Sequence, residues 1–256
     1  MGQHLVKLYQ NKIYGSGYTD PEFSLIGADS KNHFEENLKT QPLDWEYRTK
    51  HVLYNRNSLG HRCKELEMLK DNFVLFIGCS LTEGVGVALE DTFTYKLAQD
   101  LGLDYYNLGL AGSGADLLCE NLSKWFLNIK KVPKLVVIQW PAPNRYYQQF
   151  TDGLTPVGAW IAVRNGIVSD EVKRATKYDF VNEEVINNFV NASSAGYFEH
   201  FSTVLRTTTL NFLNCLGIKY IEFTDEEFPK LDVGRDLIHP GTQSNTQLSL
   251  FLRSII

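Results

Sequence analysis

The sequence predicts an α/β protein with a mostly parallel central sheet, and three observations lead to this prediction. From about residue 73 onward, strand-like and helix-like patterns alternate, as they do where helices join parallel strands. The strand-like runs are continuously apolar, which is typical of strands buried on both faces. At 256 residues, the chain is also long enough to bury a substantial core.

The first predicted elements follow one another in a regular order. A buried strand at residues 73–77 precedes a helix at 91–102, which begins with a capping aspartate and ends in glycine. A second strand at 103–108 then leads to a helix at 115–129 with one apolar face. After this helix a proline interrupts the chain, and the third buried strand covers residues 135–138.

Beyond the third strand the alternation stops for about 50 residues. We predict an insertion over the sheet at about 145–195, because a long irregular stretch inside a compact domain usually carries function. Within it, the Asn-Gly pair at 165–166 is typical of a hairpin turn, and residues 182–190 have a helical pattern.

Regular structure resumes after the predicted insertion. We expect a helix at 198–216 and a fourth strand at 218–223. Residues 1–70 show little periodicity, and we predict that they form an extension that packs on the core domain of residues 71–256. For the last helix of the chain, the apolar pattern predicts an inner face made of Leu248, Phe251, Leu252, Ile255 and Ile256.

Composition excludes several classes of protein. The net charge is −5 with no basic stripe, so we expect no nucleic-acid partner. No apolar run is long enough to cross a membrane, and the amino-terminal residues lack the pattern of a signal peptide. We therefore expect synthesis in the cytoplasm, with no membrane partner. The final location is left open, a virion included.

Two kinds of bound group are also not expected. The four cysteines show no metal-like spacing, and each lies in or beside an apolar run, so we predict small buried side chains. The first strand is not followed by the glycine pattern that binds dinucleotides, nor is there a phosphate-binding Gly-Lys loop. We expect neither a metal nor a cofactor.

Ser80 is the first candidate functional residue. It follows the first strand across a turn of small residues, Gly78 and Cys79, which would present its hydroxyl at the rim of the sheet. Far downstream, Asp236 precedes His239 by three residues, a spacing that lets one turn place the carboxylate beside the imidazole. Such residues supply a nucleophile, a base and the group that orients the base. We therefore predict a catalytic triad of these three residues.

Considered singly, these residues also have purely structural interpretations. A serine after a strand is often a turn or helix-cap residue. His239 precedes a proline that suits a first helical turn, so it could simply begin a helix. Cys79 is an alternative nucleophile, and because adjacent side chains in an extended segment point apart, only one of Cys79 and Ser80 can face the site. The serine, the aspartate and the histidine in this order favour the catalytic interpretation.

Negative charge that develops on a reacting oxygen needs preorganised hydrogen-bond donors. The backbone N–H of Ser80 is one candidate, and the glycine-rich loop at 109–114, which opens a helix, is another. The side-chain amide of Asn144 follows the third strand and is a third candidate, although asparagine after proline is also a common turn residue. All three segments leave the edge of the sheet at which open α/β folds bind ligands.

These segments resemble the four sequence blocks of the SGNH (GDSL-like) hydrolase superfamily. The blocks correspond to residues 78–81, residues 107–112, Asn144 and residues 236–240. The resemblance covers roughly residues 70–256, and it implies a flavodoxin-like three-layer α/β/α sandwich.

The resemblance also implies a role for each site residue. Ser80 would be the nucleophile, His239 the general base and Asp236 the residue that orients it. The oxyanion donors would be the N–H of Ser80, the N–H of Gly112 and the side chain of Asn144. The chain departs from the family at Cys79, where aspartate is usual. The block around Asn144 lacks its glycine and is one residue longer.

The resemblance implies a serine esterase that acts on small acyl esters, with O-acetyl groups on a carbohydrate as the favoured substrate. The alternative is a structural or adsorption protein, such as a phage virion component, that uses an esterase-like fold with or without activity. Residues 1–70 would then form the surface for an assembly partner or an oligomer. Residues 54–62 also loosely resemble SGNH proteins of bacteria and tailed phages.

Overall fold

The computed structural model describes residues 13, 20–23, 29–150, 153–158, 191–192 and 195–256. Its centre is a four-stranded parallel sheet with the strand order β2-β1-β3-β6. The four strands are β1 (Phe73–Ile77), β2 (Asp104–Asn107), β3 (Leu135–Trp140) and β6 (Tyr220–Thr224). The predicted parallel sheet is confirmed, and every residue of β1 and β3 is buried, as continuous apolar strands require.

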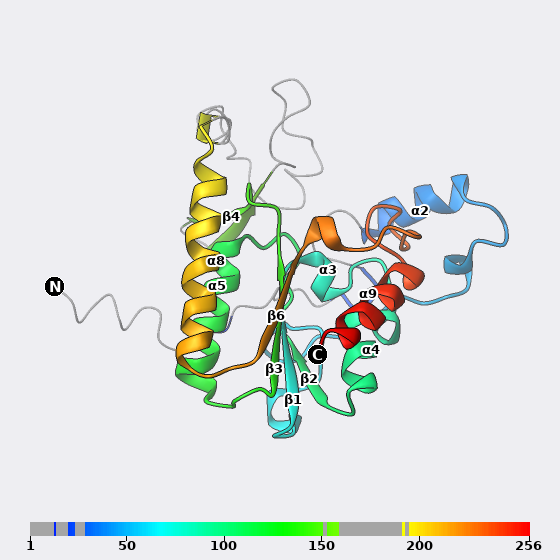
Figure 1. Cartoon of the computed structure of the whole chain (residues 1–256). Helices are drawn as coiled ribbons and strands as arrows, with labels where there is room; N and C mark the ends of the chain where they lie inside the picture. Colours follow the sequence, from blue (N-terminus) through cyan, green and yellow to red (C-terminus); the bar gives the residue numbers. More distant parts are fainter. Residues whose placement is uncertain (1–12, 14–19, 24–28, 151–152, 159–190, 193–194) are drawn as a thin grey trace.

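Helices cover both faces of the sheet (Figure 1). On one side, α5 (Ala115–Lys124) lies beside α8 (Tyr197–Cys215), and on the other side α4 (Phe93–Asp100) packs against α9 (Thr242–Ser254). A π-helical turn, η5 (Trp125–Ile129), extends α5 to the end of the predicted helix. The three-layer α/β/α arrangement is therefore confirmed.

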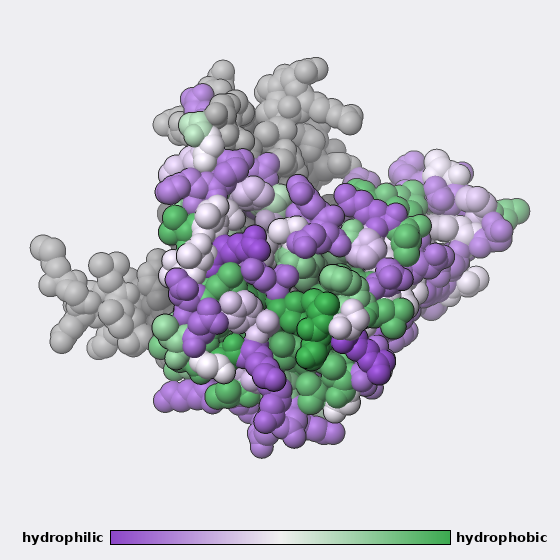
Figure 2. All heavy atoms as spheres, viewed as in Figure 1, coloured by the Kyte–Doolittle hydropathy of each residue, from purple (hydrophilic) through white to green (hydrophobic). Residues whose placement is uncertain are grey.

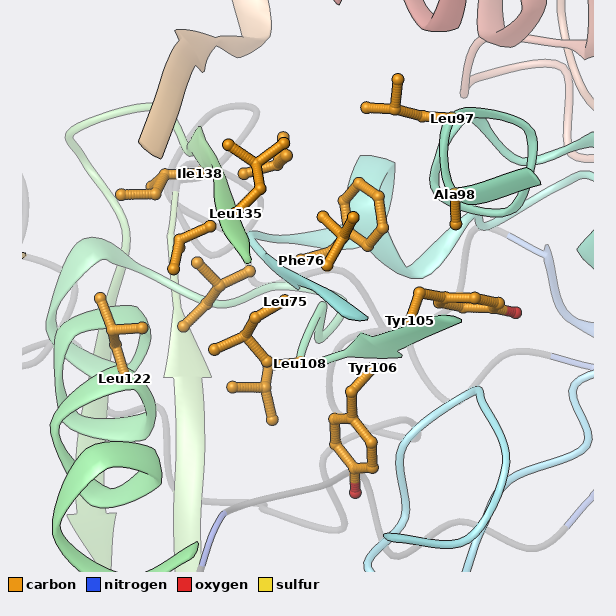
Figure 3. Close-up of a cluster of buried hydrophobic side chains, with 14 of the residues drawn as sticks. Leu75, Phe76, Leu97, Ala98, Tyr105, Tyr106, Leu108, Leu122, Leu135 and Ile138 are labelled. Atoms are coloured by element: carbon orange, nitrogen blue, oxygen red, sulfur yellow. The ribbon is translucent and has the colours of Figure 1, made fainter. Parts of the chain in front are cut away.

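The core lies in two layers, one on each face of the sheet, and Figure 3 shows part of it. Successive strand residues point to opposite faces. In β1, the Phe73 ring packs on Trp125 at 5.7 Å between centroids, whereas the Phe76 ring packs on Phe93 of α4 at 5.8 Å. Each side of the sheet thus has its own aromatic contacts with the covering helix.

The remaining elements surround this core. They are α2 (Lys31–Thr40), η2 (Glu46–Arg48), η3 (Leu66–Met68), α3 (Ser80–Glu83), η4 (Leu89–Asp91), β4 (Tyr146–Phe150), β5 (Gly153–Val157) and η6 (Asp225–Glu227). The predicted insertion at about 145–195 begins with an antiparallel hairpin of β4 and β5. The hairpin predicted at 165–166 and the helix predicted at 182–190 lie outside the described residues. Within the described part of the chain, no helix has the length and apolar character needed to cross a bilayer.

Two details of the sequence interpretation are wrong. In α9, Leu248 and Leu252 are buried as predicted, but Phe251 is more than half exposed, and so are Ile255 and Ile256 just beyond the end of the helix. Figure 2 shows apolar atoms gathered on this face, where Figure 1 places β6 and the end of α9. Instead, the buried stripe of α9 includes the small polar residues Ser244, Asn245 and Ser249.

Asn245 explains the orientation of α9. Its side chain accepts a hydrogen bond from the N–H of Phe93, which begins α4, and it donates to the carbonyls of Pro240 and Gly241. A polar residue that satisfies three backbone groups is favourable in the interface, so the helix turns its apolar tip outward. The second error concerns Cys215, which is exposed, whereas Cys63 and Cys79 are buried as expected.

Candidate active site

Ser80 begins α3 directly after β1, at the carboxyl edge of the sheet. The turn before it is tightly packed, because a Cβ added at Gly78 would lie 2.2 Å from the Thr82 hydroxyl and 2.7 Å from Oε1 of Gln139. Gln139, on β3, uses this oxygen to accept hydrogen bonds from the N–H of Cys79 at 2.9 Å and the hydroxyl of Thr82 at 3.3 Å. The neighbouring strand therefore fixes the turn that presents Ser80.

Asp236 and His239 lie in one tight turn between β6 and α9. Oδ1 of Asp236 accepts hydrogen bonds from the N–H groups of Ile238 and His239 at 3.2 and 3.0 Å. The intervening Leu237 has a φ of 59°, in the left-handed region that non-glycine residues rarely adopt. The N–H of Gly234 closes the turn on the carbonyl of His239 at 2.7 Å. The second oxygen of Asp236 is thereby aimed at the imidazole.

The three predicted triad residues meet in space. Nε2 of His239 lies 2.8 Å from Oγ of Ser80, and Nδ1 is hydrogen-bonded to Oδ2 of Asp236. The side chain of Asp236 is fully buried, and that of His239 is only 15 % exposed. Cys79, whose Sγ is 3.9 Å from Oγ of Ser80, is also buried. This arrangement can move a proton from the hydroxyl to the imidazole while the carboxylate holds the ring.

Asp236 is suited to remain ionised. Burial raises its pKa, but the hydrogen bonds from the ring and backbone of His239 and from the N–H of Ile238, together with the charge interaction with the imidazole, lower it by more. The net effect is a pKa below the ordinary value, so the group is a carboxylate at neutral pH. A carboxylate at this position stabilises the imidazolium that forms when His239 takes a proton.

The loop after β2 is bonded to the segment that carries Ser80. The N–H of Leu110 and the hydroxyl of Ser113 both donate to the carbonyl of Gly78, at 3.1 and 3.0 Å. Between them, the N–H of Ala111 donates to Oε2 of Glu83 at 2.7 Å. Gly112 follows with a φ of 78°, a conformation that glycine adopts without cost. The loop is thus held rigidly beside α3.

A pocket of about 460 Å³ opens beside the triad. Its position above the carboxyl ends of parallel strands is the usual ligand site of open α/β sheets. Among the described residues, its lining consists of Cys79, Ser80, Leu81, Arg145, Asp225, Lys230, Leu231, Asp232, Val233, Ile238, His239 and Pro240. Gly112 and half-buried Asn144 are not among these residues, so their roles as oxyanion donors stay predictions. The described residues also contain no cluster of three His, Cys, Asp or Glu side chains arranged to hold a metal.

Sequence reasoning missed several residues that support the site. Glu83 is 2 % exposed and forms an ion pair with Arg56 at 2.8 Å, and its other oxygen binds the loop after β2. Nothing in the sequence connects Arg56 with Glu83. Gln139 did carry a signal, because it interrupts an otherwise apolar strand, and a buried polar side chain needs a partner. Arg145, on the pocket wall, is next to the predicted Asn144.

No protein-family model matches the sequence, and no curated protein matches it. Similar solved structures include a member of the lipolytic G-D-S-L family from Veillonella parvula DSM 2008, at 11% identity and a TM-score of 0.36. That match covers 72% of this chain and 97% of the other.

Two carbohydrate esterases are also similar in structure. One is a carbohydrate esterase family 2 enzyme plus carbohydrate-binding domain from Corynascus thermopiles (Myceliophthora fergusii), at 15% identity and a TM-score of 0.37, over 73% of this chain and 66% of that one. The other is the acetyl xylan esterase Est2A from Butyrivibrio proteoclasticus, at 13% identity and a TM-score of 0.36, over 72% and 63%. The chain therefore spans slightly less than two thirds of the length of these two esterases.

Proposed function

We propose that the protein is a serine esterase of the SGNH type that hydrolyses small acyl esters, with O-acetyl groups on a carbohydrate as its preferred substrates. The observation that carries the proposal is the 2.8 Å contact between Oγ of Ser80 and Nε2 of His239, with Asp236 bonded to the opposite ring nitrogen. This is the geometry that converts a weakly nucleophilic hydroxyl into a reactive one.

The proposed reaction proceeds in two halves. Oγ of Ser80 attacks the ester carbonyl while His239 takes its proton. The resulting oxyanion is bound by the backbone N–H groups of Ser80 and Gly112, with the side chain of Asn144 as the third donor. Collapse of this intermediate breaks the ester bond, and His239 gives its proton to the departing alcohol. Water then attacks the acyl-enzyme with His239 as base, which releases the carboxylic acid and restores the serine.

The lining of the pocket supports a small acyl group and a hydroxylated alcohol. Four residues of the wall are charged, and they share it with five aliphatic ones. The charged residues are Arg145, Asp225, Lys230 and Asp232, and the aliphatic ones are Leu81, Leu231, Val233, Ile238 and Pro240. A long fatty acyl chain would remove such charges from water, which is costly. A sugar, by contrast, offers hydroxyl groups to the charges and apolar ring faces to the aliphatic residues.

A chromogenic acetyl ester tests the reaction. We expect turnover by the parent protein and a loss of kcat/KM of about 10³-fold or more in Ser80→Ala and in His239→Ala. Ser254→Ala and His51→Ala, at exposed positions outside the site, are matched controls that should keep the parental rate. Equal rates in the parent and both triad variants would refute the proposal.

Substrate preference needs a second series. Esters of one alcohol with acetyl, butyryl and octanoyl groups measure the acyl preference, and acetylated oligosaccharides measure the release of acetate. We expect acetyl to be preferred. A higher kcat/KM for octanoyl would contradict the small-acyl assignment and leave the triad assignment intact.

A further inference from the structure

Four buried residues from three distant segments form a closed ring of hydrogen bonds beside the triad. The Tyr54 hydroxyl donates to Oδ2 of Asp29 at 2.5 Å and accepts from the N–H of Gly86 at 2.8 Å. The carbonyl of Gly86 accepts a hydrogen bond from the N–H of Arg235 at 2.7 Å. The Arg235 guanidinium donates to Oδ2 of Asp29 at 2.9 Å, which closes the ring. We name Asp29, Tyr54, Gly86 and Arg235 the clamp ring.

Several residues of the amino-terminal part of the chain contact the Arg235 side chain. Its guanidinium makes two further contacts with Asp29, at 2.9 and 3.2 Å through Nε, and donates to the carbonyl of Glu22 at 2.5 Å. The guanidinium carbon lies 5.1 Å from the ring centroids of both Phe23 and Phe34. Because Asp29 is 0 % and Arg235 5 % exposed, displacement of either would leave a buried charge unpaired.

Tyr54 stays protonated in this environment. Burial raises its pKa well above the ordinary value, and the nearby carboxylate of Asp29 adds to the effect. The hydroxyl therefore remains a donor to Asp29, and its oxygen accepts the N–H of Gly86. One neutral side chain thus bridges the amino-terminal segment and the loop after α3.

The clamp ring touches both halves of the triad. Gly86 lies in the loop that follows Ser80, and the N–H groups of Gly84 and Val85 in the same loop donate to the carbonyl of Ser80. On the other side, Arg235 directly precedes Asp236. A Cβ at Gly86 would lie only 2.8 Å from Oδ1 of Asp236, so the two loops are in close contact.

We propose that Asp29 and Tyr54 are positioning residues, which set the distance between Ser80 and the Asp236–His239 turn through the clamp ring. The inference rests on the proposed esterase function and assigns a role to the amino-terminal segment. Ser80 and His239 are 159 residues apart in sequence, and their 2.8 Å contact requires the two loops to keep a fixed separation. The clamp ring spans that separation with one buried ion pair, the hydrogen bond from Tyr54 to Asp29 and two hydrogen bonds of the Gly86 backbone.

Tyr54→Phe is the variant that tests the clamp ring, because it removes one hydroxyl and keeps the aromatic ring. We expect kcat to fall about 10- to 100-fold with little change in KM, since a misplacement of about 1 Å has effects of that size. Tyr106→Phe is the matched control. Its hydroxyl also binds buried partners, Asn57 and His61, but has no contact with the clamp ring. We expect it to keep parental kcat within about twofold.

A second readout separates positioning from a general loss of stability and needs no turnover. The proton between Nδ1 of His239 and Asp236 gives a downfield resonance in the NMR spectrum, and its position depends on the geometry of that bond. We expect this resonance to shift in Tyr54→Phe and to stay unchanged in Tyr106→Phe. Asp29→Glu, which retains the charge but moves the carboxylate, should reproduce the shift if Tyr54→Phe folds poorly.

The outcomes distinguish this inference from the proposed function. Parental kcat and an unshifted resonance in both Tyr54→Phe and Asp29→Glu would overturn the clamp ring while the esterase proposal stands. A parent protein without turnover would refute the esterase proposal, and the resonance would then decide alone whether the clamp ring positions the Asp236–His239 turn. A shift supports the clamp ring, and no shift refutes it.

Discussion

Asp236 makes two kinds of contact at once. One carboxylate oxygen closes its own turn by accepting two backbone N–H groups, and the other holds the ring of His239. The first kind of contact fixes the carboxylate, so the second requires no reorganisation during the reaction. The turn has an energetic cost at Leu237, because a backbone φ of 59° is unfavourable for a residue with a side chain.

The replacement Asp236→Asn keeps the size of the side chain and removes its negative charge. The amide can donate to Nδ1 of His239, which would leave the proton on Nε2 and prevent that nitrogen from accepting the proton of Ser80. We expect kcat to fall about 10³- to 10⁴-fold with a far smaller change in stability. Asp225→Asn, a change on the pocket wall, is the control for the loss of a nearby charge. Activity of Asp236→Asn within tenfold of the parent would contradict the assigned role.

For single residues, the sequence predicts pairs that lie close together in the chain and misses pairs that only the folded structure brings into contact. Asp236 and His239 could be paired because three residues separate them, and the structure brings Ser80 to the same place. Glu83 and Arg56 have no such relation, since only the fold makes the buried ion pair between them.

The loops that meet beside the triad tolerate fewer residue types than the strands do, because their backbones lie very close together. Gly86 has a φ of 85° and faces Asp236, while Gly234 on the opposing loop would place a Cβ 2.8 Å from the carbonyl oxygen of Gly86. Two glycines that face each other let these backbones approach closely. Side chains at either position would push the Asp236–His239 turn away from Ser80.

Gly86→Ala tests this close approach, and Gly102→Ala is its control. Both glycines are left-handed, with φ values of 85° and 64°, but a Cβ at Gly102 would meet nothing within 4 Å. Each replacement should cost about 1–2 kcal/mol of stability from backbone strain. Only Gly86→Ala should also lower kcat, by about tenfold or more, measured well below the melting temperature of each variant. Equal kcat values in the two variants would show that the contact has no influence on the site.

The strands could be predicted because continuous apolar runs have few alternatives in a protein of this size. Predicted and observed bounds differ by two residues at most for the four strands of the sheet. The face of α9 was harder, since Phe251 and Ile255 extend an apolar stripe that the packing does not use. The hydrogen bonds of Asn245 determine which side of that helix is buried, and they depend on α4.

On the scale of the whole molecule, polar contacts join the described residues before β1 to the sheet and to the site. Arg62 donates to the carbonyls of Leu53, Gly84 and Val87. Asp104, at the start of β2, accepts hydrogen bonds from Lys64 and from the N–H of Lys70. Apolar side chains such as Leu69 also pack into the core, but they are scattered along residues 1–70 without a helical or strand period from which the attachment could be predicted.

Asp104 makes part of this attachment dependent on pH. Burial raises its pKa, but hydrogen bonds from Lys64 and from the N–H groups of Lys70 and Tyr105 lower it by a larger amount. The folded pKa therefore lies below the unfolded value of about 3.9. A lowered folded pKa adds stability that is present above pH 4 and is lost as pH falls through the folded pKa. We expect Asp104→Asn to cost on the order of 1–3 kcal/mol at pH 7. In urea unfolding, the difference between parent and variant should shrink below pH 4. A constant difference down to pH 3 would contradict the assignment.

The ion pair between Asp29 and Arg235 joins residues that are 206 positions apart. During synthesis the ribosome adds Asp29 to the chain 206 residues before Arg235, so their ion pair can form only after both have been made. Closure of so large a loop is slow, and the serine cannot be matched with its base until it has occurred. Under the proposed function, a folding chain would therefore become active only when the turn of residues 234–239 packs against the loop after α3.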